Sequence, residues 1–174
     1  KRCLHSERPA TVQTMTHPTW QPSASLEAIR ARAALLASVR AFFAARNVLE
    51  VDTPQLARYG VSDLHIQCIP VPGYGYLQSS PEYHMKRLLA AGSGPIYQVC
   101  KAFRDGEAGG RHNPEFTMLE WYRPGFALDD LIQECLALFA ALFPSAQSKT
   151  YRFRGLFRDV TGLDPLTAHD SDLI

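Results

Sequence analysis

Apolar residues recur along the chain with two different periods, and each period predicts a different kind of element. Over residues 26–46 they fall at helical spacing, with Ser25 placed to cap the first turn and Asn47 placed to end the last. A second run of the same period covers residues 128–143 and stops at Pro144. Two amphipathic helices are therefore expected, one near each end of the organised chain.

Between these helices the pattern changes to short strands bounded by turn-forming residues. The expected strands cover residues 48–51, 64–71, 74–78, 95–104 and 113–123, and a last short strand and helix share residues 151–162. A further helix over residues 80–92 is predicted because Ser80 suits its N-cap, Pro81 its first position and Gly92 its end. Helices and paired strands in this order predict an α+β fold, with an antiparallel β-sheet flanked by helices.

The start of the chain differs from the rest because it is polar, shows no period and is rich in proline. We interpret residues 1–24 as a flexible N-terminal arm and residues 25–174 as one domain. The sequence does not begin with methionine and closes on a polar, turn-like run. We therefore expect it to be part of a longer protein.

The composition is typical of a globular domain, with 46% hydrophobic and 20% charged residues. The formal net charge is only +1, which predicts no large basic face and argues against a dedicated nucleic-acid-binding module. No apolar run is long enough to span a membrane, and the first residues lack the apolar centre of a secretory signal.

The cysteines give no sign of a metal site or of a disulfide framework. They are Cys3, Cys68, Cys100 and Cys135, and none of them is spaced as a CxxC pair. A zinc site is therefore not expected. Scattered cysteines without a secretory signal indicate reduced thiols and a cytoplasmic protein.

The predicted hairpin of residues 95–104 and 113–123 carries the most chemistry. Alternate residues of a strand share a face, so Phe116, Glu120 and Tyr122 point the same way. Phe116 and Glu120 lie about 13 Å apart along that face, at roughly 3.3 Å per residue. An aromatic ring at one end, and a carboxylate with a phenol at the other, predict a long groove for stacking and polar contacts.

Cationic residues gather where this hairpin turns. Arg104 ends the first strand with a planar fork suited to phosphate or carboxylate, and Arg111 and His112 lie in the glycine-rich loop. Taken singly, such residues are more often structural, since a strand-end arginine is usually solvated and a strand phenylalanine is usually core. Their combination with Glu120 inside an apolar strand is costly for scaffolding alone and favours a functional site.

The hairpin resembles motif 2 of the class II aminoacyl-tRNA synthetases. That motif reads Phe-Arg-x-Glu, a loop, then Arg or His, three residues and Phe, and residues 103–116 follow it with one change. The wording HNPEFTMLEWY of residues 112–122 is similar to the lysyl, aspartyl and asparaginyl subgroup. The resemblance implies part of a class II synthetase catalytic core.

Two further stretches resemble the same family, and the likeness extends over about residues 20–165. The helix expected over residues 26–46 and the following residues 47–54 resemble motif 1, whose Pro54 would lie at the interface of a homodimer. Residues 79–88 resemble the amino-acid-recognition helix of lysyl enzymes. Their YHMK wording is similar to that of the lysyl-tRNA-synthetase paralogues that modify elongation factor P.

The resemblance implies a role for each matching residue. Arg104 would be the catalytic residue that holds the α-phosphate and the substrate carboxylate, and Phe116 would stack on adenine. The implied ATP-binding residues are Arg104, Asp105, Gly106, Glu107, Arg111, His112, Asn113 and Phe116. The implied residues of the amino-acid pocket are Ser80, Glu82, Glu120 and Tyr122, with Glu82 taking the ammonium. Mg²⁺ is expected beside ATP, although no metal ligand can be assigned in this chain.

One position departs from the family pattern. The motif places a glutamate two residues after the arginine, where this chain has Gly106 and only then Glu107. The adenine contact that the family gives to that glutamate would then fall to Glu107 or to the loop backbone.

Three functions remain open on the sequence. The first is an ATP-dependent ligase that activates a lysine-type amino acid, either α-lysine or (R)-β-lysine, and transfers it to a lysine of elongation factor P. The second is a lysyl-tRNA-synthetase core that charges tRNA, and the third is a non-catalytic paralogue that binds an amino acid or a partner. The first is preferred, with no tRNA partner, because too few residues precede motif 1 to form an anticodon-binding barrel. Motif 3 is also missing, so these 174 residues alone are expected not to turn over ATP.

Overall fold

The computed structural model describes residues 20–106, 109–110, 112–169 and 171 of the 174-residue chain. The helices are α1 (Leu26–Ala44), α2 (Glu82–Ala90), α3 (Leu128–Leu142) and α4 (Phe153–Thr161). The strands are β1 (Leu49–Glu50), β2 (Leu56–Ala57), β3 (Pro70–Val71), β4 (Gly75–Leu77), β5 (Ile96–Phe103) and β6 (Glu115–Tyr122). The chain thus mixes helices and strands, as the sequence predicts.

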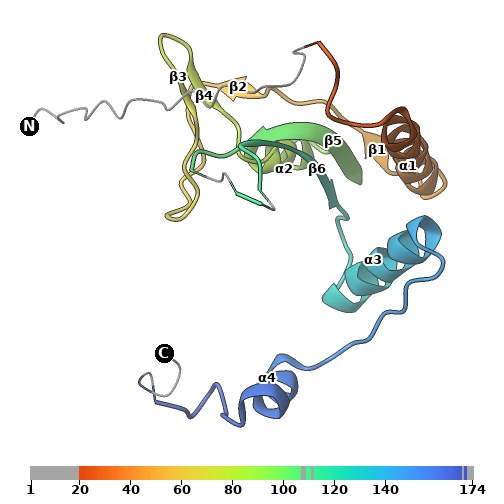
Figure 1. The fold of residues 1–174 in the computed structure, drawn as a ribbon, viewed down its shortest axis with the longest axis vertical. Coiled ribbons are helices and arrows are strands. Elements are labelled where there is room, and N and C mark those ends of the chain that lie inside the picture. Colours follow the sequence, from red (N-terminus) through yellow and green to blue (C-terminus); the bar gives the residue numbers. More distant parts are fainter. Residues whose placement is uncertain (1–19, 107–108, 111, 170, 172–174) are drawn as a thin grey trace, which may run out of the picture.

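The main sheet has the order β1-β5-β6 and is built around the predicted hairpin (Figure 1). Strands β5 and β6 pair antiparallel, from Ile96 opposite Tyr122 to Phe103 opposite Glu115, which confirms the expected pairing. Strand β1 joins the other edge of β5 in the parallel direction. The sheet is therefore mixed, because the long connection between β1 and β5 lets the chain cross over and run the same way again.

Helices α1 and α3 supply the core on one face of this sheet. Phe43 of α1 is fully buried and stacks on Tyr97 of β5, with 4.4 Å between the ring centroids. Leu138 of α3 joins the same cluster. The sheet residues packed against it are Val99, Leu119 and Trp121. Like Tyr97, these have odd numbers, so the even-numbered side chains of β5 and β6 face away from this core.

The capping residues of α1 act as the sequence predicts. The hydroxyl of Ser25 accepts a hydrogen bond from the N–H of Ala28 at 3.1 Å, and Asn47 has a left-handed φ of 52°. Helix α2 begins at Glu82, two residues after the expected cap, yet the Ser80 hydroxyl still accepts from the N–H of Glu82 at 3.1 Å.

Strands β2, β4 and β3 form a small antiparallel sheet in that order. Of the strand expected over residues 64–71, only β3 forms. Residues 64–69 fail as a strand because Leu64 is 93% exposed and buries nothing. The Asp63 carboxylate also accepts from the N–H of His65 at 3.0 Å, which favours a local turn over an extended run.

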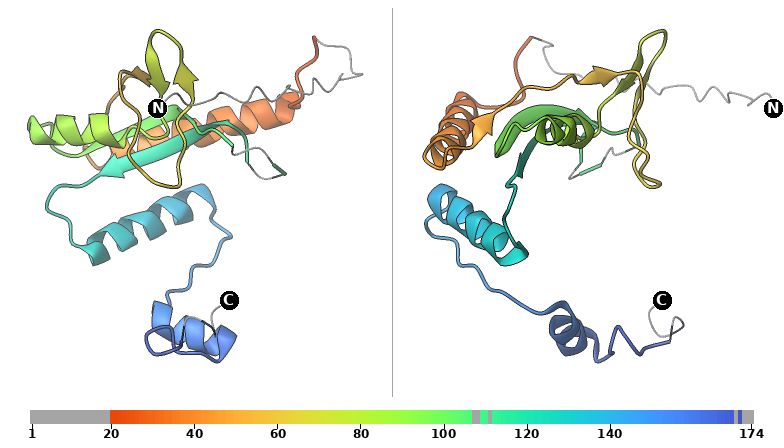
Figure 2. Two further views of the ribbon diagram at one scale, coloured as in Figure 1. Left: turned by 90° about the vertical axis from the view of Figure 1, so that its left-hand side faces the viewer. Right: turned by 180° about the vertical axis from the view of Figure 1, so that it is seen from behind.

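Helix α4 lies apart from both sheets (Figures 1 and 2) and ends at Gly162, whose φ is 75°. The strand expected just before it does not form, since residues 146–152 belong to neither a helix nor a strand. Phe153 and Val160 of α4 are 72% and 75% exposed. This helix therefore adds little to the core described above.

Candidate functional site

The even-numbered face of the β5–β6 hairpin turns away from α1 and α3 and carries the residues that the sequence singled out. Phe116, Glu120 and Tyr122 share this face of β6. Directly opposite on β5, Ala102 pairs with Phe116 and Gln98 pairs with Glu120. The register therefore gives the face two ends, one around Phe116 and one around Glu120.

Glu120 is the centre of a hydrogen-bonded group that joins the sheet to the start of α2. The Ser80 hydroxyl donates to Glu120 Oε2 at 2.8 Å, and the Tyr122 hydroxyl donates to Glu120 Oε1 at 2.6 Å. Burial, and next the hydrogen bond to Glu120, raises the pKa of Tyr122 well above its usual range. Tyr122 is thus a protonated donor at neutral pH, and its hydroxyl and that of Ser80 hold the Glu120 carboxyl group in place.

Glu82 lies close to this group but already has a cation. Its carboxylate pairs with the Lys86 ammonium one helical turn away, and the two side chains are 42% and 56% exposed. The pKa of Lys86 is raised, chiefly by the hydrogen bond that its ammonium donates to Glu82 and next by the negative charge of that carboxylate. The structure therefore brings the four predicted pocket residues together, with Glu82 at the solvent side.

At the other end of the face, the Arg104 guanidinium lies over the Phe116 ring at 5.0 Å from its centroid. The N–H of Arg104 donates to the carbonyl of Pro114 at 2.9 Å, so the arginine is fixed where the two strands part. A guanidinium over an aromatic ring is a favourable contact that a planar ligand could replace by stacking on either partner.

The loop beyond Arg104 is tied to the small sheet. The N–H of Asp105 donates to the carbonyl of Gln67 at 2.8 Å, and the Asp105 carboxylate accepts from the N–H of Gly106 at 2.9 Å. Gly106 has a φ of 75°, a conformation that glycine adopts without strain. The backbone conformation at position 106 therefore favours glycine over the glutamate of the family motif.

The rest of the loop is less closely joined to the site. His112 and Asn113 are exposed. Backbone bonds with Gly109 hold His112 in a tight turn. Glu107 and Arg111 lie outside the described residues, so their predicted contacts with ATP stay predictions.

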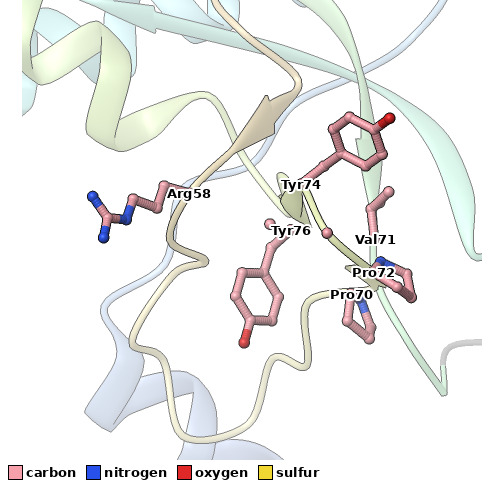
Figure 3. A pocket seen from close by; sticks show the side chains of 8 residues that line it. Arg58, Pro70, Val71, Pro72, Tyr74 and Tyr76 are labelled. Atoms are coloured by element: carbon pink, nitrogen blue, oxygen red, sulfur yellow. The ribbon is translucent and has the colours of Figure 1, made fainter.

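Two hollows of the described surface lie beside this face. One of about 600 Å³ is lined by Arg58 and residues 70–76 of the β3–β4 hairpin (Figure 3), and it holds no carboxylate. Another of about 420 Å³ lies between α2 and the segment after β1, where Pro54 lines it together with Asp52 and Thr53. Pro54 is exposed, and its place at a dimer interface stays a prediction.

Two buried polar groups were not predicted from the sequence. Gln98 and Thr53 are buried and hydrogen-bonded to each other, the Thr53 hydroxyl donating to Gln98 Oε1 at 3.0 Å. Glu134 of α3 is also buried and contacts Trp121 and Arg123. Gln98 could have been found, because the predicted pairing already places a polar residue opposite Glu120.

Cys68, Cys100 and Cys135 are free thiols, and Cys3 lies outside the described residues. Burial, and then the charges of Glu120 and Asp52, raises the pKa of Cys100 to about 11, so it is a neutral thiol at pH 7. Within the described ranges no three side chains of His, Cys, Asp or Glu gather as metal ligands. No helix in that part of the chain is both long and apolar enough to cross a bilayer.

Comparison with known proteins gives a consistent result. The family described as tRNA synthetases class II (D, K and N) matches residues 13–169. The chain is 50% identical over 166 residues to the elongation factor P–(R)-β-lysine ligase of Haemophilus influenzae strain PittGG, covering 89% of this chain and 51% of that protein. It is 52% identical over 158 residues to the ligase of the same name from Pseudoalteromonas translucida, covering 86% of this chain and 49% of the relative.

The ligase of that name from Pasteurella multocida is 47% identical over 164 residues, with 89% of this chain and 51% of the relative covered. The chain thus spans about half the length of the curated relatives it matches. The matched stretches take in most of this chain.

Proposed function

The chain belongs to the class II tRNA synthetases of the D, K and N group, and from that membership we propose that the whole protein is an ATP-dependent ligase. It activates a lysine-type amino acid as its adenylate and transfers it to a lysine of elongation factor P. The observation that carries the proposal is the identity of about half of all aligned positions with ligases of that name. The arrangement of charges on the β5–β6 face supports it.

In the first step a carboxylate oxygen of the amino acid attacks the α-phosphorus of ATP. The bond from that phosphorus to the oxygen bridging to the β-phosphorus breaks, and pyrophosphate leaves. Arg104 is the residue of this chain that meets the charge growing on the α-phosphate, because its guanidinium is a fixed fork at the end of β5. Phe116, which lies beneath that guanidinium, offers its ring to adenine.

The glycine-rich loop completes the nucleotide end in this proposal. Asn113 contacts ATP, and His112 with Arg111 reaches the outer phosphates. Asp105, Gly106 and Glu107 line the same loop and supply backbone N–H groups or a carboxylate. Mg²⁺ accompanies ATP in solution, but the described residues offer no ligand cluster for it, so no step is assigned to the ion.

The pocket at the Glu120 end, which includes Glu82 at its solvent side, receives the ammonium of the substrate. A carboxylate whose partners are hydroxyls keeps its negative charge, and it gains when a cation arrives. Ser80 and Tyr122 hold Glu120 in one orientation at 2.8 Å and 2.6 Å, so little reorganisation is needed on binding. Glu82 contributes once the substrate ammonium competes with Lys86.

In the second step the neutral amine of a lysine on elongation factor P attacks the acyl carbon of the adenylate. An amide bond forms, the acyl–phosphate bond breaks, AMP leaves, and the amine loses one proton to solvent or to a base. We also propose a homodimer that includes Pro54 and a cytoplasmic location. The exposed Leu26 and Ile29 of α1, at 68% and 46%, suit a subunit interface on that helix.

Charging of tRNA is the second candidate, and the family match itself favours it, since the matched family is named for tRNA synthetases. The two candidates separate in one experiment on the whole protein. Purified protein is given ATP and α-lysine or (R)-β-lysine, with either elongation factor P or lysine tRNA as acceptor. We expect modified elongation factor P by mass spectrometry and little aminoacyl-tRNA, and the opposite result would favour the synthetase.

Arg104→Ala is the variant that tests the first step. We expect ATP–pyrophosphate exchange to fall roughly 10²-fold or more, because one preorganised charge donor is lost. Lys101→Ala is the matched control, since Lys101 is a half-exposed cation on the same strand that pairs with Glu115. Equal losses in both variants would argue against a role for Arg104 in chemistry.

A further inference from the structure

The middle of the even-numbered face of the β5–β6 hairpin has no role in the site described above. Phe116 and Arg104 form one end of the face, and Glu120 with its hydroxyl partners forms the other. The pair between these ends is Met118 of β6 opposite Cys100 of β5. Met118 lies two residues, about 7 Å along the strand, from both Phe116 and Glu120. An apolar stretch therefore separates the two polar ends.

Burial differs between the two strands of this face. On β5, Gln98 and Ala102 are 1% and 0% exposed, and Cys100 is 8% exposed. On β6, the even-numbered residues from Phe116 to Tyr122 are all only partly buried. The part of the face that is open to solvent is therefore the row along β6, with Met118 near its centre. The neighbouring Cys100 thiol is neutral at pH 7, because burial raises its pKa to about 11, so it adds to the apolar stretch.

The length of the face agrees with the span of a lysine-type amino acid. Phe116, beneath the Arg104 guanidinium, and Glu120 lie about 13 Å apart along β6. In α-lysine and (R)-β-lysine alike, six bonds join the carboxyl carbon to the terminal nitrogen, a span of about 7–8 Å when extended. One hydrogen bond of about 2.9 Å at each end brings the total to roughly 13 Å. With the carboxyl group at Arg104 and the terminal ammonium at Glu120, the methylene chain lies over Met118.

We propose that Met118 is a further substrate-binding residue, whose thioether side chain is the apolar floor under the methylene chain of the amino acid, between Arg104 and Glu120. The inference rests on the proposed function and adds a determinant of chain length to it. A thioether side chain is flexible and polarizable, so it follows the shape of a methylene chain closely. Since both lysine isomers span the same length, the floor selects for chain length and leaves the position of the second amino group to other residues.

The test uses calorimetry on the whole protein and compares the better-bound of α-lysine and (R)-β-lysine with its homologue one methylene shorter. In the unmodified protein we expect the homologue to bind at least about fourfold more weakly, the loss for one buried methylene. Met118→Gln keeps the length of the side chain but places an amide under the methylene chain. We expect it to raise the Kd of the lysine isomer roughly 10-fold and to reduce the preference over the homologue. The KM for ATP in pyrophosphate exchange should stay within about twofold.

Thr117→Val is the matched control. Thr117 precedes Met118 on β6, and its hydroxyl accepts a hydrogen bond from Arg32 of α1 at 2.6 Å on the opposite face. Both Kd values should therefore stay within about twofold of the unmodified protein.

Met118→Ala is the second variant, which removes the floor without adding a polar group and should also reduce the preference for the longer chain. The thermal midpoint of each ligand-free variant separates binding from folding. An unchanged amino-acid Kd in both Met118 variants, an equal loss for both homologues, or a KM for ATP that rises as much as the amino-acid Kd would overturn the inference. If the unmodified protein binds neither lysine isomer, the proposed function fails with it.

Discussion

A carboxylate lies on each face of the β5–β6 hairpin, and the two carboxylates have different kinds of partner. On the core face, Glu134 of α3 is 5% exposed at its side chain and lies 3.4 Å from Arg123 Nε and 4.0 Å from Arg46 Nε. The indole N–H of Trp121 donates to its other oxygen at 3.1 Å. On the opposite face, Glu120 has only the hydroxyls of Ser80 and Tyr122 among its described partners.

The difference separates a structural charge from one that is available to a ligand. A buried carboxylate between two arginines is already paired, so it is not available to a cationic ligand. Its ion pairs join α3 to the sheet. A carboxylate held by hydroxyls is oriented without a direct ion pair, so an incoming ammonium can still pair with it. The same sheet thus has one face for stability and one that we propose for chemistry.

Removing the structural carboxylate should have the largest effect on folding. Glu134→Ala leaves Arg123, whose side chain is 12% exposed, without its main counter-charge. We expect the free energy of unfolding to fall by about 3–5 kcal/mol, measured by urea titration of the chain. Glu82→Ala, which truncates a 42% exposed glutamate, should change it by less than about 0.5 kcal/mol. Similar losses of unfolding free energy in the two variants would contradict a structural role for Glu134.

High pH gives a smaller test of the core face. Burial, and next the hydrogen bond to Glu50, raises the pKa of Tyr97 from 10.0 to about 12. The unfolded chain therefore loses the phenolic proton first. This contribution to stability is complete below pH 10 and is lost as the pH rises towards 12.

In Tyr97→Phe the stack on Phe43 remains while the ionisable hydroxyl is removed. We expect about 1–3 kcal/mol less loss of stability between pH 9.5 and pH 12 than in the unmodified chain, read from urea midpoints at each pH. Tyr122→Phe should shift the profile in the same direction, because the pKa of Tyr122 is raised too. A profile that Tyr97→Phe leaves unchanged would show that this hydroxyl is not coupled to folding.

The parts that could be predicted from sequence are those in which local pattern and pairing agree. Strands β5 and β6 followed from two apolar runs around a glycine-rich loop, and Asn47 marked the end of α1 by its tolerance of a positive φ. The alternation of side chains along β6 also predicts that Phe116 and Glu120 share one face.

The parts that could not be predicted depend on contacts between distant segments. Ser80 meets Glu120 across 40 positions of sequence, a contact that periodicity does not encode. The hydrogen bond between Thr53 and Gln98 depends on where the segment of Thr53 crosses β5. The strand expected over residues 64–69 is wrong. The N–H of His65 donates a hydrogen bond to the Asp63 carboxylate, and this single bond favours a turn there.

The most direct measurement is amino-acid-dependent ATP–pyrophosphate exchange by the whole protein in two matched variants, Glu120→Gln and Glu134→Gln, at a temperature where both stay folded. The account predicts that Glu120→Gln raises the KM for a lysine-type amino acid roughly 10- to 100-fold and leaves the KM for ATP nearly unchanged. Glu134→Gln should leave both KM values within about twofold and lower only the unfolding midpoint. An unaltered amino-acid KM in Glu120→Gln, with a raised one in Glu134→Gln, would contradict the assignment of the two faces.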